Sequence, residues 1–134
     1  MTWFKVDDGL HAHVKARRAI KESPSSMSLW VLAGSWCADQ LTDGWVSQDQ
    51  ARSLMPKTWR RDAAALVKAG FWREEDRDGE PGWVYHEWNE PGRQPTRESV
   101  LAERRAAAER QQRARDKARE SRQQSRRDSR ESHG

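Results

Sequence analysis

The sequence predicts a mainly helical α+β domain that contains a small β-hairpin and is followed by a charged tail, helical or disordered. Three observations predict this class. Apolar residues recur at helical spacing through much of the first ninety residues. Two short runs rich in aromatic and β-branched residues, separated by glycine-containing turns, favour a hairpin near residues 71–88. All aromatic residues lie before the last third of the chain, which is dominated by charge.

The two parts of the chain differ in their capacity to form a core. Residues 1–92 hold all 8 Trp, both Phe and the single Tyr, with 12 basic and 14 acidic side chains, a net of -2. Residues 93–134 carry 13 Lys and Arg against 7 Asp and Glu, a net of +6, and apart from alanine their only apolar residues are Val100 and Leu101. We therefore expect one domain over residues 1–92, with tryptophans mainly in its core, and a basic tail over residues 93–134.

The elements of the first half follow in a simple order. Residues 3–6 form a strand or an extended arm, and residues 10–20 form a helix. The side chains expected to face inward from this helix are Leu10, Val14, Ala16 and Ile20. A Ser-Pro break over residues 23–26 ends it. Residues 27–41 are the most apolar segment and predict a central, buried helix.

The second half of the domain predicts two helices around a proline turn, and then a hairpin. A very short strand at residues 45–46 precedes Ser47, which caps a short helix to Leu54 in a capping box with Gln50. After Met55-Pro56, a helix over residues 57–69 stops at Gly70. Its inward residues are Trp59, Ala63, Leu66 and Val67. The strands 71–73 and 83–88 enclose a long, mobile tip over residues 74–82.

The rest of the chain is expected to lose structure gradually. Residues 89–95 form a linker, and a helix rich in Ala, Glu and Arg starts near Thr96. Only alanine repeats at heptad spacing after Val100, so this helix does not predict a self-sufficient coiled coil. From Ser121 onward we expect disorder. The sequence leaves the oligomeric state open.

This order of elements, with two helices around a turn and then a hairpin, is that of a winged helix-turn-helix. The helix over residues 57–69 takes the place of the recognition helix, and the side opposite its tryptophan is basic. Cations neutralise phosphates, arginine can pair with guanine, and small residues allow close approach to the duplex. The predicted DNA-binding residues are Lys57, Thr58, Arg60, Arg61, Ala64 and Lys68. The alternative is that these cations are only the solvated side of an amphipathic helix.

Charge along the hairpin argues against a wing that grips DNA. Residues 73–80 carry 2 positive and 5 negative side chains, a net of -3. A wing that contacts the DNA backbone is normally basic, so we expect this one to point away from a bound duplex. The basic tail either tracks phosphates without sequence preference or serves only to solubilise the protein.

No motif predicts catalysis, a cofactor or a metal site, so the protein is not expected to be an enzyme. His11, His13, Cys37 and His86 lack the spacing of zinc ligands, and Cys37 lies in the most apolar segment. The chain has no apolar stretch long enough to span a membrane and no signal peptide at its start. These features predict a cytoplasmic protein that does not associate with membranes.

Five segments resemble winged-helix proteins of actinobacterial phages and prophages that are related to the amino-terminal domain of phage replisome organisers. They are TWFKVDDGLHAHVKARRA, LWVLAGSWCADQLTDGWVS, ALVKAGFWRE, GWVYHEWNE and PTRESVLAERRAAAERQQRAR, within residues 2–115. The resemblance implies a helix-turn-helix fold, double-stranded DNA as partner, and a role in phage replication initiation in the cytoplasm of a bacterial host, with replication proteins contacting the tail. Two alternatives stay open: a transcriptional regulator or excisionase-like factor, and a protein-interaction adaptor whose winged helix does not bind DNA.

Overall fold

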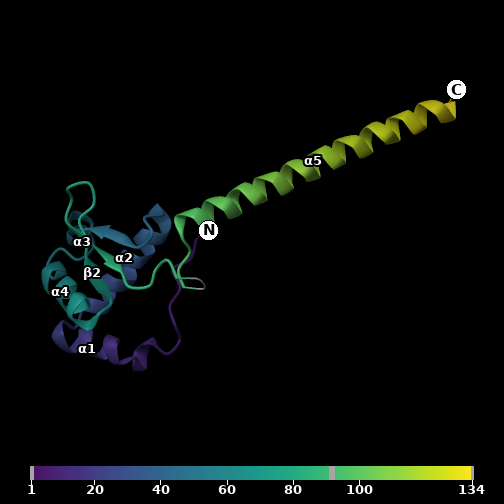
Figure 1. The fold of residues 1–134 in the computed structure, drawn as a ribbon. Helices are drawn as coiled ribbons and strands as arrows, with labels where there is room; N and C mark the ends of the chain where they lie inside the picture. Colours follow the sequence, from purple (N-terminus) through teal and green to yellow (C-terminus); the bar gives the residue numbers. More distant parts are fainter. Residues whose placement is uncertain (1, 91–92, 134) are drawn as a thin grey trace. The chain divides into compact units, whose positions relative to one another are not determined.

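The computed structural model of the chain describes residues 2–90 and 93–133, and it is mainly helical with one small antiparallel sheet (Figure 1). The chain divides into a first unit that ends at Arg97 and a second that starts at Glu98. The expected α+β class is therefore confirmed. Residues 91–92 of the predicted linker lie outside the described residues.

The described residues of the first unit form a short 3-10 helix, four α-helices and three strands, and those of the second form one long helix. In chain order the elements are η1 (Leu10–Ala12), α1 (Val14–Glu22), α2 (Ser26–Gln40), β1 (Trp45–Ser47), α3 (Gln48–Leu54), α4 (Trp59–Ala69), β2 (Trp72–Glu74), β3 (Gly82–Tyr85) and α5 (Arg97–His133). The capping box predicted at α3 is present, because Ser47 Oγ accepts a hydrogen bond from the backbone N–H of Gln50 at 3.1 Å.

The sheet has the strand order β1-β3-β2, so the first strand pairs with the last. Both pairings are antiparallel, and Ser47 lies opposite Gly82 at the end of β1. A Cβ atom at Gly82 would lie 2.5 Å from the Val46 carbonyl oxygen and 2.8 Å from the Trp45 ring. Only glycine therefore allows β1 and β3 to approach at this register.

Aromatic side chains fill the core, as the composition predicted. Trp59 and Trp72 each lie against Trp83, while Tyr85 contacts both Trp72 and Trp88. The Tyr85 hydroxyl donates a hydrogen bond to the Trp30 carbonyl oxygen inside the core, and burial raises the pKa of that hydroxyl well above its ordinary value. Of the remaining tryptophans, Trp3 is exposed, whereas Trp36 and Trp45 are half-buried, and Trp36 packs against the core.

The first helix differs from its prediction in both start and face. The helix begins only at Val14, after the 3-10 turn, and it packs through Ala16 and Ala19. Val14 and Ile20, which we expected to face inward, are 60% and 44% exposed. The predicted helix ran without a break from Leu10, whereas the change in geometry at His13 shifts the angular position of every later side chain.

The amino-terminal arm does not form a strand in the structure, although it is fixed to the first unit. Phe4 packs between Trp30 and Trp88, with ring centroids at 4.9 and 5.8 Å. The backbone of Lys5 exchanges two hydrogen bonds with the side chain of Gln94, at 2.8 and 2.7 Å. Trp88 Nε1 also donates to the Pro95 carbonyl at 3.2 Å. Residues 93–95, expected as part of a linker, are therefore held against the domain.

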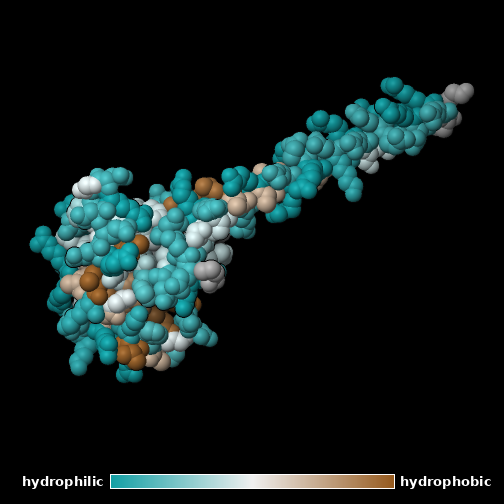
Figure 2. Space-filling model, viewed as in Figure 1, coloured by the Kyte–Doolittle hydropathy of each residue, from teal (hydrophilic) through white to brown (hydrophobic). Residues whose placement is uncertain are grey.

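Helix α5 continues past Ser121, where we expected disorder to begin, and reaches His133. Its sequence is rich in strong helix formers, and side-chain hydrogen bonds at i,i+4 spacing join Gln112 to Asp116 and Gln124 to Asp128. Figure 2 shows hydrophilic residues along nearly all of it. Among the described residues, no helix combines the length and apolar character needed to cross a membrane.

Candidate nucleic-acid interface

Helix α4 presents a sharply divided surface. Thr58 is its N-cap, and Gly70 ends it with a φ of 90°, where the Gly70 N–H is donated to the carbonyls of Leu66 and Val67. At 100° per residue, the buried side of α4 spans about 160° and centres near Leu66. Ala64 lies at the middle of the remaining, solvent-facing side. We call this side the α4 basic face; its residues are Arg60, Arg61, Ala64 and Lys68, all exposed.

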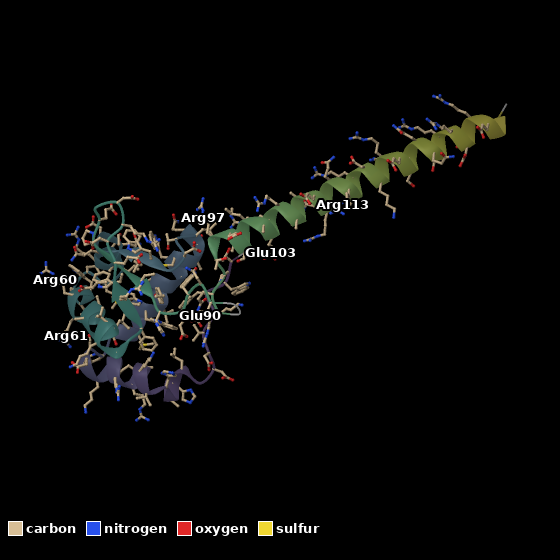
Figure 3. All side chains as sticks on the ribbon, viewed as in Figure 1. Arg60, Arg61, Glu90, Arg97, Glu103 and Arg113 are labelled. Carbon is tan, nitrogen blue, oxygen red and sulfur yellow. The ribbon has the colours of Figure 1, made fainter. Side chains whose placement is uncertain are left out.

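The structure brings four of the six predicted DNA-binding residues together on this face and places the other two before it. Arg60 and Arg61 project from α4 toward solvent in Figure 3. Lys57 is exposed but lies in the turn ahead of the helix. Thr58 is half-buried, and its hydroxyl donates a hydrogen bond of 2.6 Å to Asp62. This bond ties Thr58 to the first turn of α4.

Asp62 accepts the hydrogen bonds that hold α4 beneath its basic face, and it was not singled out from the sequence. Its carboxylate is fully buried and accepts hydrogen bonds from the hydroxyls of Ser23, Ser25 and Thr58, at 2.5, 2.6 and 2.6 Å. These three donors come from the turn before α2 and from the turn before α4. The positive end of the α4 dipole also favours a carboxylate in the first helical turn. Asp62 thereby fixes the position of α4 relative to the preceding helices.

Lys57 and the three cations of the α4 basic face are not equally available. Lys68 pairs with Glu22 of α1 at 2.7 Å, and this hydrogen bond and charge lower the pKa of the Glu22 carboxyl. The Arg60 guanidinium lies 5.1 Å from the centre of the Trp59 ring, which orders it without neutralising its charge. Within residues 2–90 and 93–133, neither Lys57 nor Arg61 forms an ion pair. Three of these four cations therefore keep an uncompensated charge.

A shallow groove runs along the other flank of α4, between that helix and the sheet. Arg60 and Val67 line it from α4, while Glu74 and Trp83 line it from the strands. The hairpin beyond it has the long tip that was predicted, since β2 ends at Glu74 and β3 begins at Gly82. Within the tip, Asp78 and Gly79, with φ of 51° and 79°, form a tight turn closed by reciprocal backbone bonds between Arg77 and Glu80.

Side-chain contacts also hold the tip against the rest of the first unit. Arg77 donates to the Thr42 carbonyl at 2.9 Å and pairs with Glu75 at 2.8 Å, while its guanidinium lies 5.6 Å from the Trp45 ring. Arg73 contacts the same carboxylate at 3.5 Å. Both arginines of the hairpin are therefore committed within the protein, and the acidic groups of residues 73–80 determine the charge that the hairpin presents to solvent.

The other chemistry-bearing residues do not assemble into a site. Among the described residues, no three His, Cys, Asp or Glu side chains are grouped so that they could hold a metal ion. His13 and His86 line one pocket beside Phe71, whereas His11 lies in η1 and lines a different one. Cys37 is fully buried, and desolvation raises the pKa of its thiol to about 12, so the thiolate that would react with electrophiles is scarce at neutral pH.

No protein-family model, curated protein or solved structure matches the chain.

Proposed function

We propose that the first unit is a winged helix that binds double-stranded DNA through the α4 basic face, without catalysing a reaction. The observation that carries the proposal is this face itself: an exposed helix side with Arg60 and Arg61 flanking the small residue Ala64, on a helix whose opposite side is anchored by Trp59 and Asp62. An α-helix with small and cationic residues on one side fits the major groove, where arginine reads guanine and neutralises phosphate.

The order and pairing of elements support this assignment. Helices α2, α3 and α4 with strands β1, β2 and β3 follow one another as in a winged helix-turn-helix, and the strand order β1-β3-β2 places the hairpin next to α4. The resemblance of the sequence to winged-helix proteins of actinobacterial phages and prophages points the same way. We accordingly propose a role in phage replication initiation, with a transcriptional regulator or excisionase-like factor as the alternative use of the same interface.

The function is tested by titrating the full chain against a fluorescent duplex of roughly two helical turns at increasing salt. If the three uncompensated cations, Lys57, Arg60 and Arg61, each neutralise one phosphate, affinity falls at least about 40-fold between about 50 and 200 mM salt. The tail, with its net charge of +6, can only steepen this dependence. Absence of saturable binding at the lowest salt concentration would contradict the proposal.

A protein-interaction adaptor is the second candidate, because the hairpin over residues 73–80 has a net charge of -3 and residues 1–92 have a net charge of -2. An acidic surface of this kind suits a basic protein partner better than a phosphate backbone. The distinguishing result is a purified partner that stays bound at a salt concentration at which duplex binding is lost, since short-range apolar contacts survive screening.

A further inference from the structure

Helix α4 lies between two neighbours of opposite charge. On one flank α1 packs against it, with Glu22 paired to Lys68 and the Lys15 side chain beside Gly70 at the end of α4. On the other flank β2 follows it directly and leads into the acidic hairpin. In Figure 1, α1 and the hairpin tip lie at opposite ends of the first unit. A duplex centred on α4 therefore meets a different electrostatic surface on each side.

The two flanks differ in the charges they leave for a ligand. Helix α1 carries four basic residues and one acidic residue, and that acidic residue, Glu22, is already paired with Lys68. The hairpin has a net charge of -3, and both its arginines are bound to Glu75. A polyanion is thus attracted on the α1 side and repelled on the hairpin side.

The cations of α1 also point in a common direction. At 100° per residue, Arg17, Arg18 and Lys21 fall within an arc of about 100° on the side opposite Ala16 and Ala19. All three are exposed, and none of them forms an ion pair within the described parts of the chain. Arg18 occupies the part of this arc nearest to Lys15 and Glu22, the residues that face α4.

The spacing of packed helices is close to the width of the DNA major groove, so a duplex bound to α4 also comes close to α1. Axes of packed helices lie roughly 8–10 Å apart, and the major groove is about 12 Å wide. A helix seated in the groove therefore places its packed neighbour at the level of the phosphates along the rim. With α4 in the groove, α1 meets one rim and the acidic hairpin meets the other.

We propose that α1, and not the hairpin, supplies the second set of phosphate contacts, through Lys15 and Arg18, the cations of α1 on and beside the side that adjoins α4. The duplex is then displaced from the acidic wing toward α1, so that the surface bound to DNA combines α4 with the helix that precedes the helix-turn-helix. This inference rests on the proposed function, because it assumes a duplex on the α4 basic face.

The test measures the salt dependence of duplex binding for Lys15→Ala with Arg18→Ala in the full chain. Losing two phosphate contacts reduces the slope of log affinity against log salt by about 2. Alanine preserves the helix, Arg18 is exposed and Lys15 is half-buried, so the unfolding midpoint is expected to change little. The matched variant on the other flank is Glu74→Gln with Glu80→Gln, which removes two exposed acidic charges and should leave the slope unchanged.

Each outcome decides one of the two proposals. An unchanged slope for the α1 variant, or a changed slope for the hairpin variant, overturns the role of α1 while leaving the α4 interface intact. An α1 variant that keeps its DNA slope but loses a protein partner would assign this surface to protein binding instead. Retention of wild-type affinity after charge reversal on α4 itself would remove the proposed function, and this inference with it.

Discussion

Reversing the two arginines of the α4 basic face, with Arg60→Glu and Arg61→Glu, is expected to weaken duplex binding at least about 100-fold, or about 2.7 kcal/mol. Both side chains are exposed and flank Ala64 at the middle of the face. Arg61 has no ionic partner among the described residues, and Arg60 is ordered against Trp59. Each substitution removes an attraction to phosphate and adds a repulsion, so its effect exceeds that of alanine.

The control for this variant must change the net charge equally. Lys5→Glu with Arg93→Glu does so at two exposed positions in the first unit, outside α4 and α1. If binding depended only on overall charge, both double variants would lose the same affinity. The α4 interface predicts a large loss for the first variant and a small, salt-screened loss for the second. Equal affinities in anisotropy titrations would contradict a localised interface.

Replacing Asp62 by alanine is expected to destabilise the first unit by about 3–5 kcal/mol. The substitution removes the acceptor shared by Ser23, Ser25 and Thr58 and leaves their hydroxyls without that partner in a buried or half-buried setting. It also leaves a cavity at a position that is fully buried. Because these bonds join the turn before α2 to α4, we expect the start of α4 to lose its fixed position first.

Urea unfolding followed by tryptophan fluorescence measures this loss, since buried tryptophans report on the core. Asp39→Ala is the matched control: Asp39 is an exposed aspartate of α2, and its removal should change the free energy of unfolding by no more than about 0.5 kcal/mol. Asp62→Asn keeps one acceptor oxygen and should fall between these two. A free energy of unfolding for Asp62→Ala that equals the control would show that the hydroxyl network does not stabilise the fold.

Local patterns in the sequence were enough to predict the elements around the interface. The Ser47 cap, the proline turn after Met55 and the Gly70 stop are each determined by residues within a few positions, so α3 and α4 appear close to where they were expected. The same holds for the exposure of Arg60, Arg61 and Lys68, because the apolar residues of a long helix define its buried side and hence the opposite side.

The features that were missed depend on contacts between distant residues. The bonds of Ser23 and Ser25 to Asp62 span 39 and 37 positions, and in the sequence an aspartate after two arginines is typical of a solvated helix surface. One clue was present: Asp62 occurs three residues after Trp59 and four before Leu66, within the apolar stripe. The face of α1 was wrong because alanines, and not Val14, pack against α4.

The length of α5 was underestimated for a different reason. Low hydrophobicity predicts the absence of a core, and we extended that to the absence of secondary structure after Ser121. A single helix requires no core when its residues favour the helical state and pair at i,i+4, as Gln124 and Asp128 do.

Whether α4 enters a DNA groove is tested most directly by attaching a DNA-cleaving reagent at the centre of the α4 basic face. Ala64→Cys can be labelled selectively with an iron chelate that generates hydroxyl radicals, because Cys37 is buried with a thiol pKa of about 12. Ser35→Cys, at an exposed position of α2, carries the same chelate as a control. The account predicts strand scission from position 64 and little from position 35. Equal scission from both positions, or scission from position 35 alone, would contradict a duplex bound to the α4 basic face.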